Sequence, residues 1–132
     1  MIVVDSSALI AILFDEPERQ AFKDIVTSGE RCVVSAVNLH ETATVLRTRS
    51  GTAAVDRLWL FIENVALEIV PFDEAQVRAA AVAFDRYGKG IDPKARLNLG
   101  DCAAYALAKL RKAPLLFKGG DFLKTDIAPA LP

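Results

Sequence analysis

The stretch Met1-Ile2-Val3-Val4-Asp5-Ser6-Ser7-Ala8-Leu9 opens the chain and joins a short apolar run to an acid and two hydroxyl residues. An uninterrupted apolar run is typical of a strand that is buried on both faces, as strands of parallel sheets are. The apolar residues 8–14 predict the first turns of a helix. Asp5 is therefore expected at the carboxyl end of a buried strand, where α/β sheets bind their ligands.

Outward from this opening, short apolar runs alternate with longer segments of helical periodicity. Further strands are expected over residues 31–35, 66–72 and 114–117, and helices over residues 17–29, 35–49, 53–64, 73–87 and 101–112. Strands separated by helices predict a parallel sheet with right-handed crossovers. We predict an α/β fold in one domain, residues 1–132, with a central parallel sheet of four to five strands and helices on both faces.

Composition narrows the class of protein. Of the 132 residues, 52% are hydrophobic and 25% charged, and no stretch approaches the run of about 18 apolar residues that a membrane span requires. Because no basic leader precedes the first strand, a cytoplasmic location is expected. A formal net charge of −1 argues against coating nucleic acid by bulk electrostatics. Cys32 and Cys102 lie in apolar stretches without a CxxC or Cys/His pattern, so we expect buried core thiols.

Four acids stand beside predicted strand ends or helix starts: Asp5, Glu41, Asp101 and Asp121. An ionised carboxylate in apolar surroundings is costly unless it is paired, hydrated or bound to a metal. Mg²⁺ and Mn²⁺ prefer oxygen ligands and are commonly held by a few carboxylates in phosphoryl chemistry. We therefore predict that these acids form a divalent-metal site for one or two ions, in which no Ser/His/Asp or Cys/His nucleophile is needed.

Ordinary roles are also open for single members of this set. Asp101 can cap a helix, and Asp121 can be a turn residue beside glycine. His40 is the only histidine, and without an HExxH motif it is expected at the surface or supporting a ligand. The chain has no GxGxxG, GxxxxGK[ST] or GxSxG pattern, which removes dinucleotide, P-loop and hydrolase-elbow chemistry.

Four segments of the chain share their order and spacing with a known family. They are Val3-Val4-Asp5-Ser6-Ser7-Ala8-Leu9, Asn38-Leu39-His40-Glu41, Asn98-Leu99-Gly100-Asp101-Cys102 and Leu115-Leu116-Phe117-Lys118-Gly119-Gly120-Asp121-Phe122. Together they resemble the PIN-domain ribonucleases, and most closely the VapC toxins of bacterial toxin–antitoxin modules. The resemblance implies a Mg²⁺- or Mn²⁺-dependent endoribonuclease that cleaves RNA and inhibits translation.

The resemblance also assigns roles to single residues. Asp5, Glu41 and Asp101 match the family's invariant acids, which bind the metal and are catalytic. Asp121 matches a fourth, more variable acid of the same site. Ser6 matches a hydroxyl that supports a carboxylate or a metal-bound water, and Asn98 matches a position whose supporting role stays open. Close relatives often carry Asn or Asp at the position of Gly120. This difference affects how Asp121, the next residue, is oriented as the fourth ligand.

The resemblance implies partners as well. A VapB-type antitoxin is expected to cover an apolar groove and to point a basic side chain into the acidic pocket, and a homodimer or a toxin–antitoxin hetero-oligomer is expected. Candidate apolar surfaces lie at Ala11, Leu13 and Phe14 and around Trp59. The loop over residues 88–100 carries bases that either hold RNA phosphates or are simply solvated: Lys89, Lys94 and Arg96.

Two other functions stay open at this point. One is a catalytically idle relative that survives as an antitoxin-binding scaffold. The other is a receiver-like phosphoacceptor module, which also uses an acidic pocket at the ends of a parallel sheet. Such modules need two adjacent acids after the first strand, whereas Asp5 is followed by Ser6 and Ser7.

Overall fold

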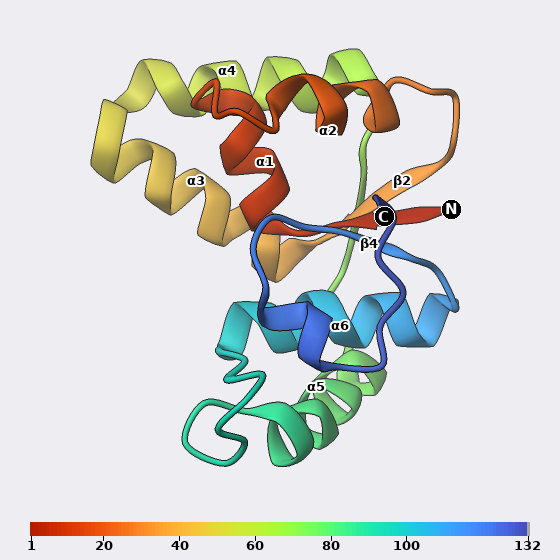
Figure 1. The fold of residues 1–132 in the computed structure, drawn as a ribbon. Coiled ribbons are helices and arrows are strands. Elements are labelled where there is room, and N and C mark those ends of the chain that lie inside the picture. Colours follow the sequence, from red (N-terminus) through yellow and green to blue (C-terminus); the bar gives the residue numbers. More distant parts are fainter. Residues whose placement is uncertain (132) are drawn as a thin grey trace.

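The computed structural model describes residues 1–131 and is built around a four-stranded parallel sheet (Figure 1). Its strands are β1 (Ile2–Val4), β2 (Cys32–Ser35), β3 (Glu68–Val70) and β4 (Leu115–Leu116), in the order β3-β2-β1-β4. Each neighbouring pair is parallel. The predicted α/β fold is confirmed, with the lower of the two strand numbers. β1 lies inside the sheet, which is why its sequence is apolar throughout.

Helices cover both faces of this sheet, as predicted. They are α1 (Ser6–Leu13), α2 (Arg19–Val26), α3 (Ala36–Ser50), α4 (Thr52–Val65), α5 (Glu74–Tyr87) and α6 (Leu99–Arg111), and a 3₁₀ turn, η1 (Asp121–Lys124), follows β4. In Figure 1, α1 to α4 lie on one side of the sheet, and α5, α6 and η1 lie on the other. Residues far apart in the chain therefore meet where the strands end.

Two hydrophobic cores result from this layering, one on each face of the sheet. Strand side chains alternate between them: Val4 and Leu116 pack with α1 to α4, whereas Val3 and Leu115 pack with α5 and α6. All four side chains are fully buried. Burying a Val or Leu side chain stabilises the fold by about 1.5–3 kcal/mol, so each face anchors the strands independently.

Several local expectations differ from the structure. α6 begins at Leu99, two residues before the predicted start, because Asn98 rather than Asp101 is the N-cap. The three-residue spacing of Ala104, Leu107 and Leu110 predicts that all three point inward, but Leu110 is 48% exposed. A helix turns 100° per residue, so a three-residue spacing drifts by 60° at each step and carries the third member off the buried face.

Ala11 of α1, expected as part of an apolar surface, is not at the surface. Ala11 is fully buried and belongs to the core, because α1 is enclosed by α2, α3 and α4. Leu13 and Phe14 are partly buried, and Trp59 is 43% exposed. Both cysteines are free and buried, as expected for core thiols. Across residues 1–131, the helices are too short or too polar to traverse a bilayer.

Candidate active site

Asp5 lies directly after β1 and begins α1. Its backbone N–H donates to the Leu116 carbonyl at the end of β4, 2.9 Å away, which places it at the carboxyl edge of the sheet. Its carboxylate is the N-cap of α1: Oδ2 accepts from the Ser7 N–H (3.0 Å) and from the Ser7 hydroxyl (2.6 Å). Only 2% of the residue is exposed. The Asp-Ser-Ser sequence therefore caps a helix and buries an acid in one step.

The second oxygen of this carboxylate is in a different situation. Asp5 Oδ1 is buried and accepts no hydrogen bond from the described residues. Burial, helped by the charges of Asp101 and Glu41, raises the pKa of Asp5 to about 7 despite the two bonds from Ser7. A buried carboxylate oxygen without a donor is costly unless a cation meets it. Asp5 is therefore short of positive charge.

Glu41 comes from the second turn of α3, the helix that follows β2 at the same edge of the sheet. The Ser6 hydroxyl donates to Glu41 Oε1, which is the supporting contact that the sequence predicts for this serine. The start of α6 approaches closely here: the Asn38 side-chain amide donates to the Gly100 carbonyl at 2.9 Å. A Cβ on Gly100 would lie 2.6 Å from Glu41 Oε1, so only glycine permits this approach.

Asp101 is the third helical residue of α6 and belongs to a complete capping box. Its backbone N–H donates to the Asn98 side chain (2.8 Å), and its Oδ2 accepts from the Asn98 N–H (3.0 Å). Burial raises the pKa of Asp101, and the charges of Asp121 and Glu41 act in the same direction. The capping box fixes the Asp101 backbone and one of its carboxylate oxygens near the other acids, Glu41 and Asp121.

Asp121 is the first residue of η1 and is exposed. Its charge reaches Asp101, as the raised pKa of that carboxyl shows. The four predicted acids thus share one neighbourhood at the carboxyl ends of β1 and β4, with Asp121 at the rim. His40, next to Glu41, is exposed and lines a separate hollow between α3 and α4.

The donor set has the chemistry that a hard divalent cation requires. All four side chains offer carboxylate oxygens, and Asp5 Oδ1 is a buried oxygen without a partner. Within residues 1–131, no three His, Cys, Asp or Glu side chains form a ready-made ligand group for a metal. The residues therefore fit a divalent cation in type and charge, and the carboxylates would have to draw closer around it.

Ser7, Gly100 and Lys118 were not predicted as site residues. The Ser7 hydroxyl bonds Asp5 and also accepts from the Lys118 N–H at 2.9 Å. A serine two residues after an N-cap Asp is a local pattern that could have indicated the hydrogen bond from Ser7 to Asp5. No local pattern indicates the close approach at Gly100, because it depends on the packing of two helices 60 residues apart.

The capping box predicts the effect of Asn98→Ala. The substitution removes the acceptor for the Asp101 N–H and should destabilise the protein by about 1 kcal/mol. Because Asp101 then moves more freely, a divalent cation added to the protein should bind roughly 10- to 100-fold more weakly. Urea unfolding and Mn²⁺ titration measure the two effects. Asn98→Ser keeps a capping oxygen and should lie close to wild type, and an equal loss in both variants would contradict this role.

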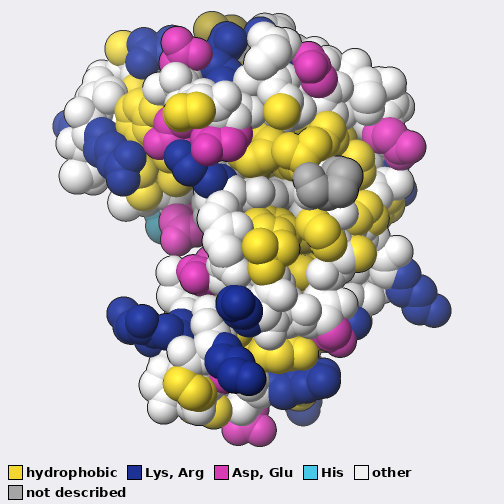
Figure 2. Space-filling model, viewed as in Figure 1, with side chains coloured by type: hydrophobic (Ala, Val, Ile, Leu, Met, Phe, Trp, Pro, Cys, Tyr) yellow, Lys and Arg dark blue, Asp and Glu magenta, His cyan; other side chains and the backbone are white. Residues whose placement is uncertain are grey.

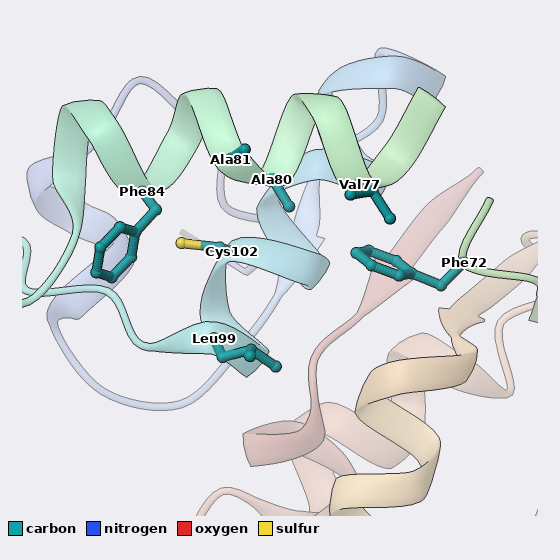
Figure 3. Close-up of a pocket in the computed structure, with 7 residues that line it drawn as sticks. All are labelled: Phe72, Val77, Ala80, Ala81, Phe84, Leu99 and Cys102. Atoms are coloured by element: carbon teal, nitrogen blue, oxygen red, sulfur yellow. The ribbon is translucent and has the colours of Figure 1, made fainter. Parts of the chain in front are cut away.

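An apolar hollow of about 550 Å³ lies between α5 and the start of α6. In Figure 3, Phe84 and Phe72 stand at its two ends, with Leu99, Cys102 and Ala80 between them. Leu99 is 78% exposed although it is two residues from Asp101. Burial and the Asp101 charge raise the pKa of the Cys102 thiol to about 11, which keeps it protonated. The hollow is a surface for apolar contact.

Comparisons with known proteins identify the family to which the chain belongs. The PIN domain family matches residues 2–128. VapC ribonuclease Mb0640 of Mycobacterium bovis is 43% identical over 131 residues, covering 98% of this chain and 99% of that protein. Ribonuclease VapC of Mycolicibacterium smegmatis is 42% identical over 126 residues, covering 96% and 97%.

Solved structures share the fold at lower identity. Mycobacterium tuberculosis VapC20, described as a sarcin-ricin loop cleaving toxin, superposes with a TM-score of 0.82 at 18% identity, and the match covers 100% of both chains. FitAcB of Neisseria gonorrhoeae gives a TM-score of 0.67 at 18% identity, covering 98% of this chain and 96% of that one. From the family match and the two close relatives, the chain belongs to the PIN domain family and, within it, to the VapC ribonucleases.

Proposed function

We propose that this protein is a divalent-metal-dependent endoribonuclease that acts as the toxin of a VapBC-type module, cleaving RNA and so inhibiting translation. The observation that carries the proposal is Asp5: a buried carboxylate with one unpartnered oxygen, beside Asp101 and Glu41 at the carboxyl edge of a parallel sheet. Relatives with 43% identity over nearly the whole chain bear the name ribonuclease. We take residues 1–132 as one nuclease domain.

The acids have separate tasks in this proposal. Asp5, Glu41 and Asp101 would hold one or two Mg²⁺ or Mn²⁺ ions, with Asp121 at the exposed side. A bound ion lowers the pKa of a coordinated water and offsets charge on the phosphodiester. The protein's part is to orient the ligands. Ser6 holds Glu41, the capping box holds Asp101, and burial of Asp5 strengthens every charge interaction around it.

RNA phosphates would be met by a basic loop next to the acids. The loop, residues 88–98, is closed at its base, because Lys89 N–H donates to the Leu97 carbonyl and Leu97 N–H to the Tyr87 carbonyl. Three of its side chains are exposed and form no ion pair within the described residues: Lys89, Lys94 and Arg96. In Figure 2, Lys and Arg side chains gather over this part of the molecule. Phosphate contacts of this kind position the backbone without reading sequence.

Cleavage of RNA by the purified protein tests the proposal. We expect cleavage with Mg²⁺ or Mn²⁺ and none with EDTA, because the acids cannot act without a cation. Asp101→Asn, which keeps the side-chain size but removes a charge, should cleave at background rate. Wild-type protein that neither binds Mn²⁺ nor cleaves would instead favour a catalytically idle, antitoxin-binding scaffold. Sequencing RNA 5′ ends after brief induction in cells would identify the target.

We also propose a VapB-type antitoxin as the partner. A hollow of about 380 Å³ between α1, α2 and α4 is lined by apolar side chains, three bases and one acid: Ile12, Leu13, Phe61, Arg19, Lys23, Arg57 and Asp15. Asp15 pairs with Arg19, which leaves Lys23 and Arg57 as the basic groups that suit an amphipathic segment with acidic flanks. The exposed Trp59 and Leu60 extend apolar surface on α4. For a homodimer, the apolar hollow beside Leu99 is the available surface. We expect the protein to act in the cytoplasm, where its RNA substrate is.

A further inference from the structure

We propose that Ser7 is a positioning residue. It holds the Asp5 carboxylate in an orientation in which only one oxygen, Oδ1, is directed at the divalent cation. The inference rests on the proposed function and concerns how the site is built. Two neighbouring serines each support a different acid. The Ser6 hydroxyl donates to Glu41, and the Ser7 hydroxyl donates to Asp5. The sequence resemblance pointed to Ser6 alone.

The direction of the Ser7 hydroxyl proton follows from its two partners. Its oxygen lies 2.9 Å from the Lys118 nitrogen and 2.6 Å from Asp5 Oδ2. A backbone N–H can only donate, so the hydroxyl oxygen accepts from Lys118 and its proton points to Asp5. The Ser7 N–H, 3.0 Å away, donates to the same Oδ2. Oδ2 is therefore engaged by two donors, whereas Oδ1 has none.

Lys118, whose N–H donates to the Ser7 hydroxyl, is itself held in place by two acids. It follows β4, and its side-chain Nζ lies 3.1 Å from Glu16 Oε1 and 3.2 Å from Glu18 Oε2, on the turn after α1. The contact from Lys118 to Ser7 spans 111 residues of sequence. The Ser7 hydroxyl thus joins the segments that follow β1 and β4 at the carboxyl edge of the sheet. Rotation of the Asp5 carboxylate would break the bonds on both sides.

A carboxylate fixed in this way can offer a cation one oxygen in one direction. Removing the Ser7 hydroxyl leaves the Lys118 N–H without its acceptor and leaves Oδ2 with one donor instead of two. Asp5 can then turn, and the cation loses a pre-oriented ligand. Because the Ser7 N–H bond persists, we expect weaker metal binding rather than its abolition. Loss of such a supporting bond typically costs about 10- to 100-fold in metal affinity.

Mn²⁺ binding to the full chain, measured by electron paramagnetic resonance, tests the proposal without reference to RNA cleavage. Ser7→Ala should raise the Mn²⁺ dissociation constant by about 10-fold. Ser7→Thr keeps the hydroxyl and should restore the wild-type constant. Ser7→Cys, similar in size but with a weak donor, should behave like Ser7→Ala. Ser28→Ala, whose hydroxyl donates to the Ile25 carbonyl far from the acids, is the matched control and should bind as wild type does.

The outcomes separate this inference from the proposed function. Urea unfolding in EDTA shows whether each variant is folded, so a merely structural loss is visible as reduced stability without a hydroxyl-dependent change in affinity. If wild type binds Mn²⁺ and Ser7→Ala binds it equally well, Ser7 does not position Asp5 and the proposed function stands. If wild type binds no Mn²⁺, the proposed function itself fails. Weakening in Ser7→Ala that Ser7→Thr does not reverse also contradicts the inference.

Discussion

Asp5→Asn should abolish RNA cleavage, with a loss of at least about 10³-fold, the order seen when a group that stabilises developing charge is removed. Asn keeps one oxygen to accept the bonds from Ser7, so the cap of α1 is preserved. It loses the negative charge on the buried, unpartnered side of the carboxylate. Cleavage rates of a labelled RNA with saturating Mn²⁺ measure the effect. Cleavage within a few-fold of wild type would show that Asp5 is not a metal ligand.

The same substitution should change how stability depends on pH. The pKa of Asp5 is about 7 in the folded protein, against 3.8 for an unperturbed Asp. A raised pKa means that the folded state binds the proton more tightly, so the metal-free protein loses stability as pH rises from about 4 to 7. At 1.36 kcal/mol per pH unit, this loss is on the order of 4 kcal/mol.

Asp5→Asn removes that titration. In EDTA, its free energy of unfolding should therefore fall much less than that of wild type between pH 5 and pH 8. Asp101 contributes a smaller slope of the same sign in both proteins, because its pKa is raised as well. Urea unfolding at the two pH values provides the comparison. Parallel pH dependence of the two proteins would contradict the burial of an uncompensated Asp5 carboxylate.

Gly100→Ala should separate activity from stability. The new methyl group would lie 2.6 Å from Glu41 Oε1 and 2.9 Å from Oε2, closer than such atoms approach. The obstacle is the end of a flexible side chain, so Glu41 can move aside at little cost to the fold. Its carboxylate then leaves the Ser6 hydroxyl and the position that we propose for the metal. A displacement of about 1 Å in a catalytic group can cost roughly 10²-fold in rate.

Stability should be unchanged or slightly higher in this variant, because Ala is favoured over Gly within a helix by up to about 1 kcal/mol. Gly120→Ala is the matched control: it also lies beside the acids, but its added Cβ would meet no atom within 4 Å. It should cleave RNA nearly as wild type does. Thermal unfolding and cleavage rates distinguish the two variants. A destabilised Gly100→Ala, or an active one, would contradict the proposed contact with Glu41.

Sequence patterns predicted the strands and the neighbourhood of the acids, because both depend on short-range chemistry. The apolar run before Asp5 indicates a buried strand, and in a parallel sheet all strand ends of one kind meet at one edge. The patterns did not predict the contacts that orient the carboxylates. The Lys118 bond to Ser7 and the close approach at Gly100 depend on how β4 and α6 pack against the first half of the chain.

Helix boundaries show the same division between local and tertiary causes. Asn98 and Asp101 are three residues apart, a capping spacing, yet Asp101 alone was taken as the helix start. Leu110 was assigned to the core by its three-residue spacing from Leu107, and the helix turn carries it to the surface. The first difference concerns local capping chemistry. The second also depends on which face of α6 packs against α5 and the sheet.

The two hydrophobic cores have a consequence for how the protein loses activity. Asp5 and Glu41 are attached to the core beneath α1 to α4, whereas Asp101 is attached to the core beneath α5 and α6. Segments of a protein open locally with free energies well below that of global unfolding. An opening of either half separates the acids while the other half keeps its amide protons protected from exchange. We therefore expect activity to follow the less stable half of the molecule, so that inactivation precedes global unfolding.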